Sequence, residues 1–212
     1  MIVYGSSLSP FVRKTLAYVA EKGLTVQVKP VNLGSSEPDF VACSPFRKMP
    51  GFRDGDFTIS DSTAIITYLE AKFPDPPLVP TEARSRARTI WYEEFADTIL
   101  IACMGKPFFD RVVAPRFLGR EGDLAAADKA EREELPLLLN YIERVLPNSG
   151  FLVDDRLTLA DLAVVSPFVN MQHVGFRPDA RKYPKTVAFV NTMLARPSFA
   201  ELIAKERAFL SR

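Results

Sequence analysis

Two short segments each place hydroxyl or carboxyl groups at the start of an expected helix. In Ser9-Pro10, the proline fits the first helical position, where its missing amide hydrogen is no loss, so Ser9 is the natural N-cap. Asp61 and Ser62 likewise precede a run of helix-forming residues. The free amide groups and the dipole at a helix N-terminus favour an anion. These residues are therefore candidates for binding a negatively charged group.

The first 75 residues alternate between strand and helix patterns. A β-prone run at residues 2–5 leads through a polar loop into a helical spacing of apolar side chains, which Gly23 ends. Asp54-Gly55 is a strong hairpin-turn signal between two later strands. We therefore expect the order βαβαββα, which forms an α/β layer. The expected strands lie at residues 2–5, 25–31, 51–53 and 57–59, and the expected helices at residues 11–22, 37–43 and 61–73.

A proline-rich stretch at residues 75–80 separates this layer from the rest of the chain. It cannot continue a helix or lie in a central strand, so it is typical of a stiff linker. Beyond it the patterns are helical, and Thr158 stands three residues before Asp161, as in a capping box that starts an apolar, buried helix. We predict one domain at residues 1–75, a linker at 76–83 and an all-helical domain at 84–212. The expected helices lie at residues 82–104, 123–146, 158–169, 186–195 and 198–209.

The composition is that of an ordinary globular protein. Of its 212 residues 47% are hydrophobic and 25% are charged, so the chain can bury a core. Lys plus Arg number 27 against 26 Asp plus Glu, and a net charge of +1 provides no basic field for a nucleic-acid backbone. No stretch reaches the roughly 18 apolar residues of a membrane span, and the first residues lack the features of a signal peptide. We expect no nucleic-acid or membrane partner and a cytoplasmic location.

Cysteine and histidine are scarce. Cys43 and Cys103 are far apart and lack Cys-x-x-Cys spacing, so we expect buried thiols and neither a disulfide nor a zinc site. The single histidine, His173, offers no histidine-based metal cluster and is expected on a helix surface or in the core. We expect no metal and no permanently bound cofactor.

The whole chain resembles the cytosolic glutathione transferases, in particular serine-type members such as bacterial and plant ones. Residues 4–14 resemble the loop and helix start where those members keep a catalytic hydroxyl. Residues 48–50, Lys-Met-Pro, resemble the stretch in which a cis-proline exposes the preceding backbone to glutathione. Residues 61–65, Asp-Ser-Thr-Ala-Ile, match the motif that grips the γ-glutamyl end, and residues 157–161 match the family's folding-related cap. The resemblance implies a thioredoxin-like first domain, a helical second domain and glutathione as co-substrate.

The resemblance implies that a serine stabilises the glutathione thiolate. A free thiol has a pKa of about 8.5, and lowering it by about two units needs roughly 2.7 kcal/mol of preference for the charged form. A hydroxyl hydrogen bond to a charged group contributes about 1.5–3 kcal/mol, and a helix N-terminus adds about 0.3–1 kcal/mol. Both effects converge at Ser9, our first candidate, with Ser7 and Ser6 as alternatives. Arg13 adds positive potential nearby or is solvated or paired with a carboxylate.

The other glutathione contacts are also implied by the resemblance. Pro50 is expected to follow a cis peptide bond, with Met49 pairing its amide and carbonyl with the cysteinyl backbone as an added strand does. Ser62 is expected to bind the γ-glutamyl carboxylate, while Asp61 meets the γ-glutamyl ammonium group; both residues would otherwise simply cap the helix. Lys48, and less directly Arg47, would contact the glycyl carboxylate or remain solvated.

The second substrate is expected beside apolar, mostly aromatic residues of the long helix that follows the linker and of the segment just beyond it. This content suits apolar electrophiles, although many of these side chains must belong to the core. The candidates are Tyr92, Phe95, Met104 and Phe108. Residues 91–97 resemble a family stretch whose aspartate reaches the neighbouring subunit's glutathione, which implies a homodimer and makes Asp97 a candidate ligand.

The expected activity is conjugation of the glutathione thiolate to an electrophile, as in detoxification. Disulfide-reducing relatives carry a cysteine where this chain has Ser9, and the Ser-Ser-Cys segment of maleylacetoacetate isomerases is here Ser6-Ser7-Leu8. An isomerase, a peroxidase, a disulfide reductase and a non-catalytic binding module of the same fold remain alternatives.

Overall fold

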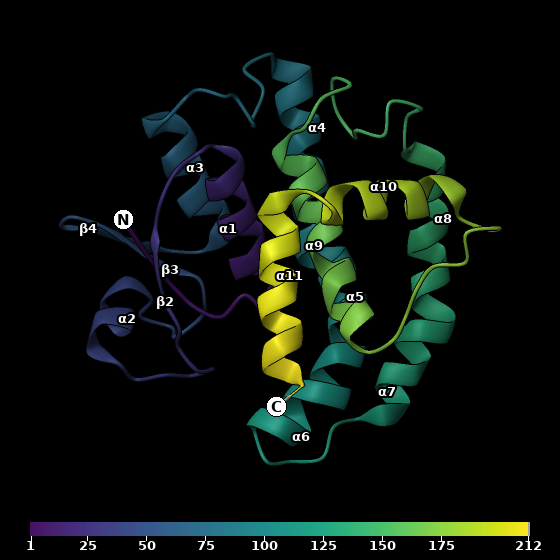
Figure 1. Ribbon diagram of the computed structural model, residues 1–212, viewed down its shortest axis with the longest axis horizontal. Coiled ribbons are helices and arrows are strands. Elements are labelled where there is room, and N and C mark those ends of the chain that lie inside the picture. Colours follow the sequence, from purple (N-terminus) through teal and green to yellow (C-terminus); the bar gives the residue numbers. More distant parts are fainter. Residues whose placement is uncertain (212) are drawn as a thin grey trace. The chain divides into compact units, whose positions relative to one another are not determined.

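The structure, a computed structural model, describes residues 1–211. The chain divides into two compact units. The first comprises residues 1–79 together with the C-terminal helix that begins at Pro197, and the second comprises Pro80–Arg196. Each unit contains its own set of packed elements (Figure 1). No described helix has the length and apolar character that crossing a bilayer requires.

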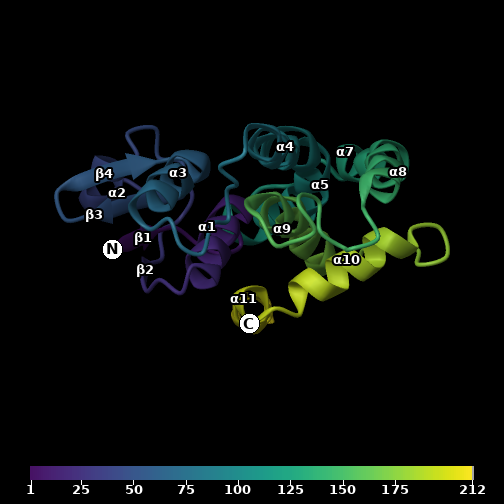
Figure 2. The same ribbon diagram turned by 90° about the horizontal axis from the view of Figure 1, so that it is seen from above.

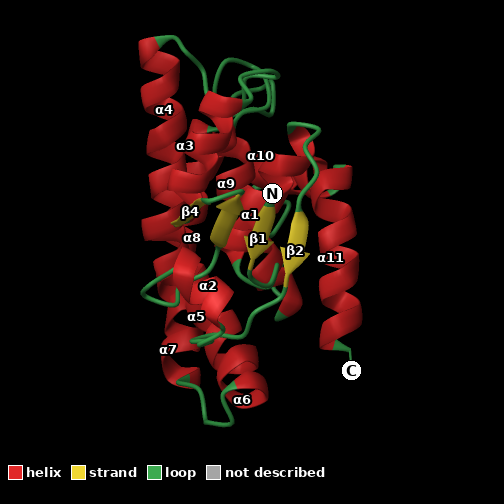
Figure 3. Cartoon of the chain, turned by 90° about the vertical axis from the view of Figure 1, so that its left-hand side faces the viewer, coloured by secondary structure: helices red, strands yellow, loops and turns green. Residues whose placement is uncertain are grey.

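The first unit is built on a four-stranded mixed sheet with the strand order β2-β1-β3-β4. Strand β1 pairs in parallel with β2 and antiparallel with β3, and β3 pairs antiparallel with β4. The predicted order βαβαββα is confirmed. The strands are β1 (Ile2–Tyr4), β2 (Gln27–Lys29), β3 (Gly51–Asp54) and β4 (Phe57–Ser60). β2 is shorter than the predicted run at 25–31 because it pairs only with β1, which is itself three residues long; the two strands lie side by side in Figure 3.

Helices cover both faces of this sheet. Strand side chains alternate between faces, and Tyr4 packs against Phe40 of α2, which places Tyr4 on the α2 face. Phe52 points to the opposite face, where its ring lies 5.8 Å from that of Tyr68 of α3. Helix α1 packs against α3. The helices are α1 (Pro10–Glu21), α2 (Pro38–Cys43) and α3 (Ser62–Lys72).

The C-terminal helix α11 (Pro197–Leu210) packs against α1 and groups with the first unit. The buried Arg13 guanidinium binds the carboxylate of Glu206 with two bonds of 2.9 Å, and the Ser198 hydroxyl donates to Glu21 at 2.6 Å. From its sequence this helix was expected, with the rest of residues 84–212, in the helical domain. Its grouping differs because these ion and hydrogen bonds join residues from opposite ends of the chain, which no local pattern reveals.

The second unit is built from helices joined by loops, and its α9 (Leu159–His173) packs against α4, α5 and α10 (Figure 2). Residues 159–171 of α9 are buried, as predicted. At its start the Asp161 carboxylate accepts hydrogen bonds from the Thr158 amide at 2.8 Å and from the Leu152 amide at 2.8 Å, which confirms the predicted cap. The other elements are α4 (Ala83–Glu94), η1 (Phe95–Leu100), α5 (Ile101–Phe108), η2 (Phe109–Val113), α6 (Ala114–Phe117), α7 (Leu124–Lys129), η3 (Ala130–Glu134), α8 (Leu135–Val145) and α10 (Pro184–Leu194).

The segments η1, η2 and η3 are π-helical turns within longer helices. The helix predicted at residues 82–104 therefore continues to Phe117 through two π-turns. A π-turn carries more residues than an α-turn, so the direction in which later side chains point shifts relative to a regular helix. This shift bears on the residues expected at the second-substrate site.

Candidate active site

The strand register brings the three predicted site segments to one edge of the sheet. Tyr4 pairs with Gly51, and Gly51 pairs with Ser60, so these residues form one row across β1, β3 and β4. Strands β1 and β4 end at this row, and the antiparallel β3 begins there. The segments directly beyond it are residues 5–9, 49–50 and 61–62. Adjacent strands lie about 4.8 Å apart, so a small extended ligand can contact all three segments.

Ser9 occupies the N-cap position of α1, as predicted. Its backbone is extended, with φ −74° and ψ 125°, and its amide donates to the Ser6 carbonyl at 2.9 Å. The Ser9 side chain makes no capping hydrogen bond, although it is half-buried. Helix α1 therefore begins with a hydroxyl that its own first turn does not use. The Ser6 hydroxyl, by contrast, accepts from the Leu8 amide at 3.4 Å, while Ser7 is half-buried in the same loop.

Gly5 lets the serine loop approach Met49 closely. Its φ of +152° is rarely adopted by residues with a side chain, and a Cβ there would lie 2.6 Å from Val12 Cγ2 and 3.3 Å from Met49 Cβ. Gly5 was not among the site residues predicted from the sequence. A glycine directly between a strand and a helix-capping loop was the available signal. Gly5 therefore joins two of the three site segments.

The Met49–Pro50 peptide bond is cis, as the resemblance implied. The Met49 side chain packs against the cluster of buried residues that includes Tyr4, Phe40 and Cys43. Just before it, the Ser44 hydroxyl donates to the Lys48 carbonyl at 2.6 Å and accepts from the Lys48 amide at 3.0 Å. These two hydrogen bonds fix the turn, and the side chain of Lys48 remains exposed.

Asp61 caps α3 with an unusual backbone. Its Oδ1 accepts hydrogen bonds from the Thr63 amide at 2.9 Å and the Ala64 amide at 3.1 Å. Its φ is +81° with ψ 129°, a conformation that costs a residue other than glycine about 1–3 kcal/mol and that clusters at functional sites. Ser62 follows as the first helical residue and is only 2% exposed. Asp61 is exposed and its capping bonds use Oδ1, so it can cap the helix and also contact a ligand. Ser62 is more deeply buried than Asp61.

Arg13 is paired with a carboxylate, one of the three roles expected for it. The Arg13 and Glu206 side chains are 0% and 1% exposed, and the carboxylate accepts two bonds from the guanidinium. The Glu206 carboxylate thus compensates the charge of Arg13, so Arg13 does not serve as an uncompensated cation for the site.

The residues expected at the second-substrate site lie mostly in the interior of the second unit. Phe95 is 4% exposed and its ring lies 5.1 Å from that of Tyr141, while Met104 is 1% exposed. Phe108 is 4% exposed and packs 6.0 Å from the ring of His173, which is thus partly a core residue, as expected. Tyr92 alone of the four candidates is half-buried, and burial raises the pKa of its hydroxyl. Asp97 lies in the π-turn η1 and is half-buried.

Both cysteines are buried, as predicted. Burial raises the pKa of the Cys43 thiol, and burial raises that of Cys103 to about 11, so both thiols are protonated at neutral pH. Cys103 donates to the Ala130 carbonyl at 3.5 Å. Within the described part of the chain, no cluster of His, Cys, Asp and Glu side chains has the grouping of a metal site.

Comparison with known proteins identifies relatives of both units. The sequence pattern described as "Glutathione S-transferase, N-terminal domain" matches residues 3–77, and the pattern described as "Glutathione S-transferase, C-terminal domain" matches residues 95–197. A glutathione S-transferase of Hyoscyamus muticus is 30% identical over 210 residues, which cover 96% of this chain and 97% of the relative. A stringent starvation protein A homolog of Coxiella burnetii is 24% identical over 212 residues, covering 99% of this chain and 94% of the relative.

The fold also matches solved structures. The crystal structure of a glutathione S-transferase from Rhodospirillum rubrum F11 superimposes with a TM-score of 0.85 at 25% identity, covering 95% of this chain and 90% of that protein. The thioredoxin-like layer, the helical second unit and the sheet edge with Ser9, Met49 and Asp61 are thus accompanied by full-length sequence similarity. The chain belongs to the glutathione S-transferase family and is a glutathione transferase, with glutathione as its co-substrate.

Proposed function

We propose that this enzyme is a serine-type glutathione transferase in which Ser9 stabilises the glutathione thiolate for attack on an apolar electrophile. The observation that carries this proposal is the Ser9 hydroxyl at the start of α1, which makes no capping hydrogen bond. The Ser6 hydroxyl accepts from the Leu8 amide and could still donate, but Ser9 stands at the N-cap of α1, where the helix N-terminus adds to a hydroxyl bond, so Ser9 is the stronger candidate of the two. Ser7 is the remaining alternative in the loop.

In the proposed reaction, the thiol of bound glutathione loses its proton to solvent, and the Ser9 hydroxyl donates a hydrogen bond to the resulting thiolate. The thiolate sulfur then forms a bond to the electrophilic carbon, and the electron pair of the broken bond leaves with the displaced group or stays on the opened substrate. A hydroxyl bond of about 1.5–3 kcal/mol and a helix N-terminus of about 0.3–1 kcal/mol suffice for a thiol pKa lowered by about two units. Proximity to the bound electrophile provides the rest of the acceleration.

The remaining glutathione contacts follow the edge of the sheet. Met49 offers its backbone to the cysteinyl residue, as a strand offers its edge to an added peptide, and Pro50 follows it in the cis form. Both capping bonds of Asp61 go to Oδ1, so Oδ2 can meet the γ-glutamyl ammonium group while Ser62, at the N-terminus of α3, binds the carboxylate. Lys48, with Arg47, provides exposed positive charge for the glycyl carboxylate.

The electrophile is proposed to contact Tyr92, the half-buried member of the aromatic group. Phe95, Met104 and Phe108 support it from the core of the second unit, where they are almost fully buried. We further propose a cytoplasmic homodimer that acts in detoxification, with Asp97 contacting the glutathione of the neighbouring subunit. We propose functional domain limits of residues 1–75 and 84–212, with α11 as the part of the second that packs on the first unit.

The test is the ultraviolet absorbance of the bound thiolate, titrated with pH in the wild type and in Ser9→Ala, Ser7→Ala and Ser6→Ala. We expect Ser9→Ala to raise the pKa of the bound thiol by about one to two units, which corresponds to a lost bond of about 1.5–3 kcal/mol. We expect the other two variants to leave it within about half a unit. An unchanged band in Ser9→Ala, with a loss in Ser7→Ala, would transfer the role to Ser7.

The activity class is tested by retention on immobilised glutathione and by turnover. Halogenated aromatics, epoxides, peroxides and disulfides distinguish conjugation from peroxidase or reductase activity, and a cis-trans isomerisation assay covers the isomerase. Binding of glutathione without a thiolate band or turnover would support a non-catalytic binding module and contradict the conjugation proposal.

A further inference from the structure

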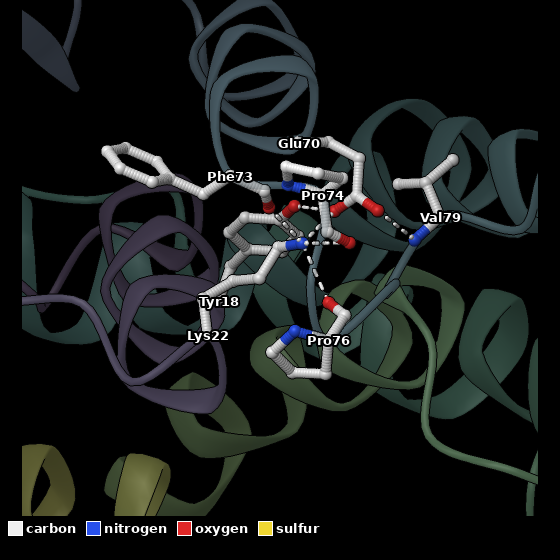
Figure 4. Close-up of polar contacts among 7 residues, drawn as sticks. All are labelled: Tyr18, Lys22, Glu70, Phe73, Pro74, Pro76 and Val79. Atoms are coloured by element: carbon white, nitrogen blue, oxygen red, sulfur yellow. Dashed lines mark hydrogen bonds and ion pairs between the residues drawn. The ribbon is translucent and has the colours of Figure 1, made fainter.

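Lys22 stands at the end of α1 and is surrounded by acceptors from another part of the chain (Figure 4). Its ammonium donates to the carbonyls of Phe73 at 2.7 Å, Pro76 at 2.7 Å and Pro74 at 3.2 Å. It also lies 2.7 Å from Glu70 Oε2, and its side chain is 0% exposed. Three donor hydrogens thus serve four acceptors, all on α3 or the segment that follows it.

Glu70 extends the cluster on the side of α3. Its Oε2 accepts a short hydrogen bond from the Tyr18 hydroxyl, and its Oε1 accepts from the Val79 amide at 3.3 Å. Burial and the bond to Glu70 raise the pKa of Tyr18, so the phenol remains a protonated donor. We call Tyr18, Lys22 and Glu70, with the carbonyls of residues 73, 74 and 76, the Lys22 clamp. The clamp ties α1, α3 and the chain leaving α3 together at one place.

The clamp lies at the opposite ends of α1 and α3 from the active site. Strands β1 and β4 are both antiparallel to β3, so they run in the same direction and end at the same edge of the sheet. Helix α1 starts after β1 and α3 starts after β4, so both helices begin at that edge and run away from it together. Their first turns carry Ser9 and Asp61, and their last turns meet at Lys22. A helix of 12 residues spans about 18 Å, so the clamp does not touch glutathione.

We propose that Lys22 is a positioning residue of this enzyme: the clamp fixes how far α1 lies along α3 and thereby sets the spacing between Ser9 and the Asp61–Ser62 pair. The inference rests on the proposed function, in which one glutathione molecule contacts both helix starts. A helix moves along its axis as a rigid body, so a displacement at the last turn appears at the first. A displacement of about 1 Å from a productive geometry can cost about a hundredfold in rate.

The test compares Lys22→Met, which keeps the length of the side chain and removes its donors, with Lys72→Met as the matched control. Lys72 lies in the last turn of α3 and forms an ion pair with Asp54, but its side chain is 43% exposed; its ammonium donates to the Asp54 carboxylate and the Tyr68 hydroxyl and lies 5.6 Å from the centre of the Phe73 ring. Crystal structures give the axial position of α1 along α3, and calorimetry measures the Kd for glutathione. The pH profile of kcat reports the pKa of the bound thiol.

We expect Lys22→Met to displace α1 along α3 by about 1 Å, to weaken glutathione binding by about tenfold or more, and to shift the pH profile of kcat to higher pH. The KM for the second substrate should stay within about twofold, and Lys72→Met should match the wild type in every readout. If Lys22→Met does not fold, Glu70→Gln keeps the three carbonyl bonds, and we expect smaller changes of the same sign.

Two results would overturn the positioning role. One is a folded Lys22→Met enzyme with the wild-type Kd for glutathione and the wild-type pH profile. The other is a fall in kcat that is equal at all pH values with unchanged KM, because that pattern reports only a smaller folded fraction. If the wild type itself does not bind glutathione, the proposed function fails, and the position of α1 along α3 in the two crystal structures decides the clamp separately.

Discussion

Replacing Glu206 with Gln should destabilise the first unit strongly, because it leaves the guanidinium of Arg13 buried without a compensating charge. The two side chains are 0% and 1% exposed, and both N–O bonds are 2.9 Å long. Removing one partner of a buried pair costs about 3–5 kcal/mol, whereas an exposed pair contributes about 0–1 kcal/mol. The burial places this pair in the first class, so we expect a loss of about 3–5 kcal/mol in the free energy of unfolding.

The assay is equilibrium unfolding in urea, followed by circular dichroism, for three variants. Glu201→Gln makes the same substitution at an exposed position of α11 and should change the free energy of unfolding by less than about 0.5 kcal/mol. The double variant Arg13→Met with Glu206→Met removes both charges and keeps apolar volume, so it should recover most of the loss. The two Glu→Gln variants share the same chemical change, so their difference isolates the burial of the pair.

A loss below about 1 kcal/mol in Glu206→Gln would refute the reasoning, because it would mean that water reaches the guanidinium. A double variant that is as unstable as Glu206→Gln would also refute it, since the cost would then come from lost packing between α1 and α11 and not from an uncompensated charge.

Two further predictions concern the cap of α9 and the serine loop. Burial raises the pKa of Asp161 to about 6, above its ordinary 3.8, so the folded state binds this proton more tightly. The free energy of unfolding of the wild type relative to Asp161→Asn should therefore fall by about 2.4 kcal/mol between pH 4 and pH 7. Urea unfolding across this range checks it, and a difference that rises with pH would mean that the bonds from Leu152 and Thr158 outweigh burial. Gly5→Ala should lose about 1–3 kcal/mol of stability and weaken glutathione binding, because the added Cβ would lie 2.6 Å from Val12. Gly34 also has a positive φ, of +71°, but open space around it, so Gly34→Ala should lose stability and keep the Kd for glutathione.

The parts of the site that could be predicted from sequence are those set by local chemistry. Pro10 fixes the start of α1, so Ser9 is its N-cap whatever the rest of the chain does. Asp61 is recognisable as a cap because its carboxylate can accept from the first amides of the helix that follows it. Asp54-Gly55 identifies the β3–β4 hairpin. The sequence indicates each segment but not their distance from one another. That depends on the pairing of Tyr4 with Gly51 and of Gly51 with Ser60, which is a property of the folded sheet.

For Phe95 and Phe108 the sequence could not distinguish a core position from a position in a ligand pocket. Apolar residues at helical spacing are the same signal for a core face and for a ligand pocket, and here both rings are buried against Tyr141 and His173. The π-turns η1 and η2 add to the difficulty, because each changes the phase of the helix between Glu94 and Ala114. A regular period therefore assigns later side chains to the wrong face.

Arg13 and Lys22 have the same apparent pattern in the sequence, a cation on an amphipathic helix, yet the structure gives them different partners. Arg13, one turn after Ser9, is compensated by Glu206, so the positive end of α1 owes its attraction for an anion to the amide groups and the hydroxyl. Lys22, at the other end, binds the carbonyls that follow α3 and so opposes the negative ends of both helices. Each cation is buried with its own acceptors, and neither contributes a free charge near the sulfur. In the proposed mechanism the lowering of the thiol pKa comes from the first turn of α1, which is why loss of the Ser9 hydroxyl and loss of the Lys22 clamp should shift the same pH profile in the same direction.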